Sequence, residues 1–213
     1  MTSKPEESGI RPGGKRRVSS IVGLSLLEVI RALDLPAEVL ASEDPTQTMP
    51  RRLGLSEVVE QQIRLFREQV RRKEKITDKE TQDLVHLVLR RPDSEEAFFQ
   101  AGDRLADGVK VVGGIKKLYS EKARYSLARR ESRKLVKSLF GRPIGGFAHG
   151  PFNLEARGHF LLDLDPGGDA CALLTGLTQA VLRACLSQKV RVIHTSCEAR
   201  KGDQCRWVVA DPE

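Results

Sequence analysis

All four cysteines of the chain lie between Cys171 and Cys205, close to its only tryptophan, Trp207. His194 falls within the same stretch. Thiolate sulfur and imidazole nitrogen are the ligands that zinc prefers in proteins. Free cysteine is also among the residue types most often buried as small hydrophobes. This concentration of residues therefore predicts either a metal site or a group of cysteines that are buried in the core as small hydrophobic residues.

A helix followed by a hairpin is the expected setting of these residues. Apolar residues recur at helical spacing from Asp169 to Ser187. Residues 189–196 are rich in β-branched side chains, residues 200–203 have turn composition, and residues 204–209 complete the hairpin. With Lys201 at the middle of the turn, Cys197 and Cys205 lie opposite each other, with Cβ atoms roughly 5 Å apart.

Two facing cysteines admit three interpretations: a cross-strand disulfide, two buried hydrophobes, or half of a metal site. The chain shows no signal peptide, so we expect a cytoplasmic protein, in which a stable disulfide is the least favoured of the three. Zinc would need two further ligands, and Cys171 and His194 are the candidates. A regular strand would aim His194 and Cys197 at opposite faces, so this site requires a bulge near Thr195 and Ser196.

Several motifs resemble the 4-vinyl-reductase domain family, most closely the sensor domains of phenol-responsive bacterial transcription activators. The family signature is an acidic residue followed by a Cys-x-Ala-x-Gly-x-x-x-Cys-Arg pattern or a close variant, and here one extra residue separates the alanine from the glycine. The matching positions, in chain order, are Glu155, Ala156, His159, Cys171, Gly176, His194, Cys197, Ala199, Gly202, Cys205 and Arg206.

The resemblance implies a structural zinc ion held by Cys171, Cys197 and Cys205, with His194 in place of the family's glutamate. It also implies a fold related to the subunits of the TRAPP vesicle-tethering complex. A tryptophan that helps to form the aromatic-effector pocket in the sensors is missing, since residues 149–152 read His-Gly-Pro-Phe. Phenol sensing is therefore not implied.

Bulk composition and the known catalytic motifs argue against several classes of protein. The chain of 213 residues is 31% charged and 39% hydrophobic, and it has no apolar run near the ~20 residues that span a bilayer, so we expect no transmembrane segment. It has neither a dinucleotide-binding Gly-x-Gly-x-x-Gly after a strand nor a Gly-x-Ser-x-Gly elbow. Zinc with four protein ligands would leave no position for substrate. An enzyme is therefore disfavoured.

The stretch 115–140 predicts a basic helix that carries much of the net charge of +7. Such a helix could bind an acidic protein or an anionic surface, or it could present a solvated face above a buried one. No nucleic-acid-binding motif accompanies it, so nucleic acid is disfavoured. The candidate residues for an anionic partner are Lys116, Lys117, Lys122, Arg124, Arg129, Arg130, Arg133, Lys134 and Lys137.

The order of elements predicts an α+β fold, in which helices cover one face of an antiparallel sheet. We expect a disordered basic tail (1–20), a helical extension (21–50) and the 4-vinyl-reductase-like domain (51–213). Thr77 and Glu80 form a capping box at the start of a helix. Residues 152–164 are expected to be extended, with Glu155 and His159 as polar residues on an exposed strand face.

These patterns favour a regulatory or sensory binding module with a structural zinc site, binding a small apolar ligand or a partner protein and forming a homodimer. Two alternatives remain open. One is an accessory factor of tetrapyrrole biosynthesis, as the family's name suggests. The other is a scaffold that docks an acidic partner or an anionic surface through the 115–140 helix.

Overall fold

The computed structural model describes residues 15–34, 57–107, 109, 120–186 and 190–210. Within these residues the fold is α+β, as predicted, with helices packed beside small antiparallel sheets. The helices are α1 (Ser20–Asp34), α3 (Glu57–Arg71), α4 (Asp78–Leu89), α5 (Ser94–Leu105), α7 (Glu121–Phe140), α8 (Phe160–Leu164) and α9 (Ala172–Leu186). The strands are β1 (Arg16–Ser19), β2 (Lys75–Thr77), β3 (Gly146–Phe147), β4 (Asn153–Ala156), β5 (Val192–Ser196) and β6 (Cys205–Val209).

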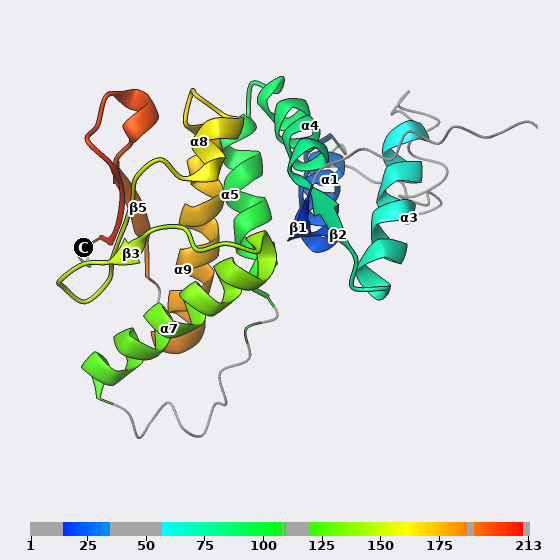
Figure 1. Cartoon of the computed structure of the whole chain (residues 1–213). Coiled ribbons are helices and arrows are strands. Elements are labelled where there is room, and N and C mark those ends of the chain that lie inside the picture. Colours follow the sequence, from blue (N-terminus) through cyan, green and yellow to red (C-terminus); the bar gives the residue numbers. More distant parts are fainter. Residues whose placement is uncertain (1–14, 35–56, 108, 110–119, 187–189, 211–213) are drawn as a thin grey trace, which may run out of the picture.

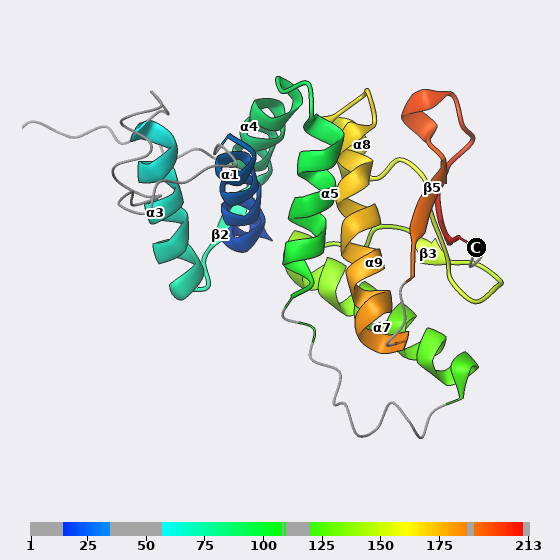
Figure 2. The ribbon, with the colours of Figure 1, turned by 180° about the vertical axis from the view of Figure 1, so that it is seen from behind.

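The elements form successive layers, from the sheet through α9, α5 and α1 to α3 (Figure 1). Helices α5 and α9 run side by side at the centre, as the view from behind also shows (Figure 2). Their backbones are in direct contact, because a Cβ at Gly102 would overlap the carbonyl oxygen of Leu173, and one at Gly176 would overlap that of Phe99. These two glycines therefore set the distance between the central helices.

Helix α9 is the most deeply buried long element of the described structure. The segment Asp169–Leu186 is long and apolar enough to cross a membrane by length and composition, but 78% of it is buried inside the molecule. It follows a short 3-10 turn, η1 (Asp169–Cys171), so the predicted helix begins slightly later than expected. Ser187, its predicted end, lies outside the described residues. The burial of α9 accounts for its apolar composition.

The larger sheet has the strand order β3-β4-β6-β5, with every pair antiparallel. Its inner face packs on α9, where Trp207 is fully buried and its Nε1 donates to Thr175 Oγ1 at 3.1 Å. On the outer face, Arg206 Nε donates to Glu155 Oε1 at 2.9 Å. Polar and apolar side chains thus alternate between the faces, as expected for a sheet that is covered on one side.

The region around His159 differs from its prediction. Of residues 152–164, which were expected to be extended, only β4 is a strand, and Phe160–Leu164 form helix α8 with His159 as its N-cap. The run Phe-Leu-Leu-Asp-Leu does not alternate, and Gly158 has a positive φ of 51° that turns the chain. The capping box of Thr77 and Glu80 at the start of α4, in contrast, is confirmed.

The amino-terminal region differs from the prediction of a disordered tail (1–20) followed by an appended helical extension (21–50). Residues Arg16–Ser19 form β1, which pairs with β2, and Val18 is fully buried. Helix α1 is not an appended segment, because it packs on α5 and Ser25 Oγ donates to the Ala101 carbonyl at 3.0 Å. Residues 16–34 therefore belong to the common core. The rest of the predicted tail (1–14) and extension (35–50) lies outside the described residues.

Candidate metal centre

Four side chains from the predicted stretch come together where α9, β5 and β6 meet. They are Cys171, His194, Cys197 and Cys205, and the atoms they offer as ligands all lie within 4.8 Å of one another. Cys171 ends η1, His194 lies on β5, Cys197 follows β5, and Cys205 begins β6. The structure thus brings together the predicted ligand set, which could hold a metal ion.

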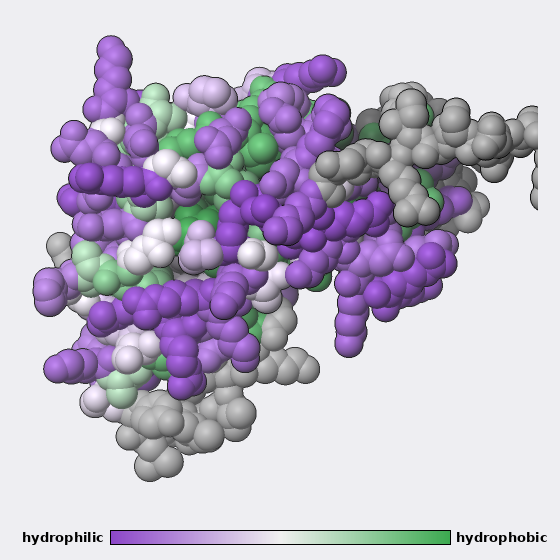
Figure 3. Space-filling view, viewed as in Figure 1, coloured by the Kyte–Doolittle hydropathy of each residue, from purple (hydrophilic) through white to green (hydrophobic). Residues whose placement is uncertain are grey.

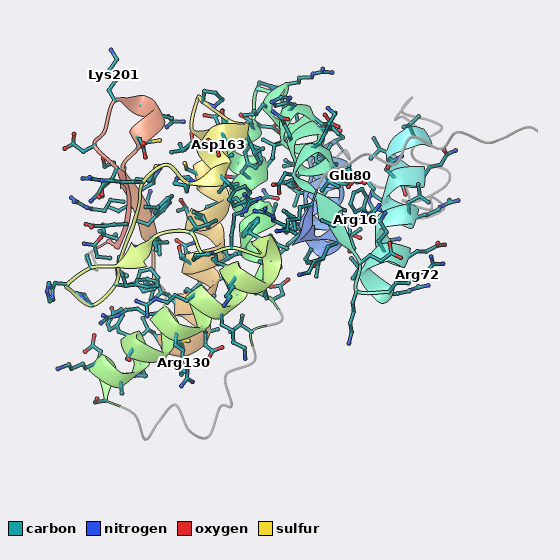
Figure 4. The ribbon with its side chains drawn as sticks, in the orientation of Figure 1. Arg16, Arg72, Glu80, Arg130, Asp163 and Lys201 are labelled. Carbon is teal, nitrogen blue, oxygen red and sulfur yellow. The ribbon has the colours of Figure 1, made fainter. Side chains whose placement is uncertain are left out.

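Two local features of the hairpin let His194 and Cys197 reach the same point. The pairing of β5 with β6 shifts register between His194 and Ser196, which is the bulge that the sequence required. Beyond it the chain turns through Lys201, whose φ is 68°, and the Gly202 N–H donates to the Cys197 carbonyl at 2.8 Å. Lys201 lies at the tip of the hairpin and points away from the molecule (Figure 4).

The spacing of the sulfurs fits a metal centre better than a disulfide. Cys171 Sγ and Cys205 Sγ are 4.0 Å apart, and neither of these cysteines forms a disulfide. A tetrahedral zinc ion with bonds of about 2.3 Å to sulfur separates two sulfurs by about 3.8 Å, whereas a disulfide needs about 2.05 Å. The fourth cysteine, Cys185, is buried on α9 and does not belong to the cluster.

The contact between Cys171 and Cys205 has opposite effects on the pKa values of the two thiols. The hydrogen bond with Cys205 and burial raise the pKa of Cys171 far above its ordinary value. The same hydrogen bond lowers the pKa of Cys205, helped by His159, by His194 and by the Glu198 N–H, which donates to Cys205 Sγ at 3.4 Å. Contact with Cys171 thus favours the thiolate form of Cys205, and thiolate is the form in which cysteine binds a metal ion.

The ring of His194 lies beside the sulfurs and packs against a neighbouring aromatic ring. It stacks on Trp207, with ring centroids 4.6 Å apart and an angle of 8° between the planes. Its Nε2 atom is buried and finds no hydrogen-bond partner within the described structure. A buried polar atom without a partner is unfavourable unless something else satisfies it. The donor set therefore fits a metal ion on its chemistry, and an ion bound at Nε2 would satisfy this buried nitrogen.

His159 is the residue near the centre whose position was not predicted. It was expected on an exposed strand face, but it is only 6% exposed, and its Nε2 lies 4.0 Å from Cys171 Sγ. Glu155, the other residue of that expectation, does lie on the outer face and pairs with Arg206. Gly158, directly before His159, was the available signal, since a glycine at a strand end commonly turns the chain.

No protein-family model, curated protein or solved structure matches the chain. The site is therefore interpreted from its own geometry and chemistry.

A groove of about 1060 Å³ adjoins the metal cluster. It lies between the first turns of α5 and the free edge of β5, with one face of α9 as its floor, and His194 forms part of its wall. The apolar part of the lining includes Phe99, Val190, Val192 and Ile193. The polar part includes Thr175 and Gln179 and the charged side chains of Glu95, Glu96, Arg183 and Arg191. Gln179 Oε1 also accepts a hydrogen bond from the Val192 N–H at 2.9 Å. A molecule in this groove would touch a predicted metal ligand.

The basic residues of α7 differ in how far their side chains are committed to contacts within the molecule. Arg124 Nη1 donates to the Leu186 carbonyl at 3.1 Å, and the guanidinium of Arg133 lies 5.0 Å from the centroid of the Phe147 ring. Arg129 is half-buried, with its Nε unpartnered in the described structure. Arg133 is exposed although its guanidinium lies over Phe147, and the other exposed basic residues, Lys122, Arg130, Lys134 and Lys137, are called here the α7 stripe. Lys116 and Lys117 lie outside the described residues.

Proposed function

We propose that this protein is a non-catalytic regulatory or sensory binding module, built around a structural zinc ion. The observation that carries the proposal is the convergence of Cys171, His194, Cys197 and Cys205 within 4.8 Å. Three thiolates and one imidazole suit zinc, and four protein ligands fill its tetrahedral coordination. Zinc in such a site stabilises the fold and leaves no open position for catalysis.

The groove beside the centre is the proposed binding site of the module. Its volume is comparable with that of small-molecule pockets, which reach about 1,000 Å³, and its lining combines apolar side chains with two acidic, two basic and several neutral polar ones. These properties suit a small apolar ligand or a segment of a partner protein. Because His194 belongs to both sites, an occupant of the groove would contact the side chain that helps to hold the hairpin.

Metal analysis of protein purified without added zinc tests the proposal. Wild-type protein is expected to carry stoichiometric zinc, and Cys197→Ser is expected to lose most of it, because the variant lacks one of the three thiolate ligands. Cys185→Ala is the control, since Cys185 is also buried but lies outside the cluster. If the wild-type protein carries no metal, the four residues of the cluster are merely packed together and the proposal is contradicted.

The family resemblance supports the proposal without being required by it. We propose that the region from β4 to β6 corresponds to a 4-vinyl-reductase-like domain with a TRAPP-like arrangement of sheet and helices. The order of strand, helix and hairpin, and the cluster formed by the positions that match the family's ligands, support this.

A scaffold function that uses the α7 stripe is a second candidate. Hydrophilic residues gather along α7 on the face shown in Figure 3, and the four stripe residues are exposed. Spacing at every third or fourth position puts Arg130, Lys134 and Lys137 on one side of the helix, where they could meet an anionic surface.

Charge reversal tests this second candidate. Lys134→Glu with Lys137→Glu is expected to weaken binding to vesicles containing phosphatidylserine in a sedimentation assay, since each basic residue near such a surface contributes about 1 kcal/mol. Lys201→Glu, at the exposed hairpin tip, is the control for net charge and is compared with Lys134→Glu alone, because each changes the net charge by the same amount. Binding that persists in about 0.5 M salt would contradict an electrostatic mechanism.

A further inference from the structure

His159 lies beside the metal cluster without belonging to it. The side chain is only 6% exposed, and its Nε2 is 4.0 Å from Cys171 Sγ. Its other ring nitrogen, Nδ1, is buried and has no hydrogen-bond partner within the described residues. The polar partner of this imidazole is therefore on the Nε2 side, and it is sulfur. A buried imidazole in this position needs an explanation.

The backbone ties His159 to the hairpin that carries the other ligands. Strand β4 ends at Ala156, the chain turns at Gly158, and His159 then caps α8. The N–H of Gly158 donates to Glu198 Oε2 at 2.8 Å, and Glu198 directly follows Cys197. The turn before His159 is thus bonded to the loop between Cys197 and Cys205, which fixes the imidazole relative to the centre.

The net charge of the proposed metal centre explains why a hydrogen-bond donor such as His159 would lie beside Cys171. Three thiolates and a neutral imidazole around Zn²⁺ leave one net negative charge in a buried place. Buried charge is unfavourable unless hydrogen-bond donors compensate it. Cys205 receives a donor from the Glu198 backbone, at 3.4 Å. Cys171 is 1% exposed, and the donor that lies beside its sulfur is the ring of His159.

We propose that His159 is a positioning residue for the metal centre, whose Nε2–H donates a hydrogen bond to the thiolate of Cys171. This inference rests on the proposed zinc site. A neutral thiol is a weak acceptor, whereas a metal-bound thiolate makes a charge-assisted bond. The bond therefore stabilises the metal-loaded form in particular, and it slows the loss of zinc by holding Cys171 in place. His159 itself does not coordinate the ion.

Two substitutions at this position separate the hydrogen bond from packing. In His159→Leu the donor is lost while an apolar side chain of similar size fills the space; in His159→Gln an amide N–H can take the place of Nε2–H. Transfer of zinc to an excess of a chromophoric chelator gives the release rate. His159→Leu is expected to release zinc about 10–100 times faster than wild type, the range usual for lost outer-shell partners. His159→Gln is expected to stay close to wild type.

Two further measurements decide what the rates mean. Cobalt-substituted wild type and His159→Leu are expected to show the same thiolate-to-cobalt charge-transfer intensity and the same ligand-field bands, because the four ligands are unchanged. Metal-free wild type and His159→Leu are expected to unfold at similar urea concentrations. Altered ligand-field bands would make His159 a ligand and overturn the inference, as would a variant destabilised equally with and without metal.

Failure of this inference is distinguishable from failure of the proposed function. Wild-type protein that binds no zinc contradicts both. Zinc-loaded wild type and His159→Leu with equal release rates contradict the role of His159 alone and leave the structural zinc site intact.

Discussion

Alanine at Gly176 or at Gly102 is expected to destabilise the protein strongly. The new Cβ would meet the backbone of the facing helix: Phe99 for Gly176 and Leu173 for Gly102. A backbone carbonyl inside a helix cannot move aside as a side chain can, so α5 and α9 would have to separate. We expect a loss at or above the upper end of the about 1–3 kcal/mol typical of overpacked cores.

The sign of this effect makes the prediction informative. In an exposed helix, replacing glycine by alanine is favourable by up to about 1 kcal/mol. Urea unfolding of Gly176→Ala, Gly102→Ala and a control therefore distinguishes close helix contact from intrinsic propensity. Gly146→Ala is that control, since nothing lies within 4 Å of a Cβ there. Unchanged stability of Gly176→Ala would mean that the helices do not touch as described.

The sequence predicted the long helices α7 and α9 because their own apolar periodicity defines them, whereas it did not predict the short helix α8. The capping box of Thr77 and Glu80 is a local signal, and so is the bulge demanded by the spacing of His194 and Cys197. Strand β1 could not be predicted in the same way. It consists of Arg-Arg-Val-Ser, and its partner β2 lies more than fifty residues further along the chain. A single buried valine between polar residues shows no alternating pattern that would predict a strand. The segment becomes a strand only because it pairs with β2 in the folded structure.

The metal cluster was predictable because unusual residue types mark it, whereas His159 was not. Alternation along an assumed strand placed His159 among exposed polar residues. The turn at Gly158 changes the direction of the chain, and the imidazole then points inward to Cys171. For the basic helix, periodicity indicated which residues share a face, but not that Arg124 reaches the Leu186 carbonyl or that Arg133 lies over Phe147.

Removing the metal is expected to loosen the hairpin of β5 and β6 before the rest of the molecule unfolds. The ion would link the start of α9 to both strands, whereas the core of α1, α5 and α9 does not depend on it. We expect a loss on the order of 5 kcal/mol, less than the about 10–16 kcal/mol of zinc-finger peptides, because the core already folds most of the chain. Such a loss lowers Tm by about 10–20 °C in a protein of this size.

Trp207 makes this prediction measurable without a label. It is the only tryptophan of the chain, it is fully buried, and its ring stacks on His194. A chelator is expected to shift its fluorescence to longer wavelength together with the fall in Tm, and hydrogen exchange is expected to accelerate in β5 and β6 more than in α5.

Cys205→Ser provides an independent route to the same state. Because Cys205 offers one of the four ligand atoms, the variant is expected to have a lowered Tm even without chelator. Changes that remove the same interaction do not add. A chelator should therefore lower the Tm of wild type and of Cys185→Ala, but should have little further effect on Cys205→Ser. Equal chelator effects on all three proteins would place the bound metal somewhere other than this cluster.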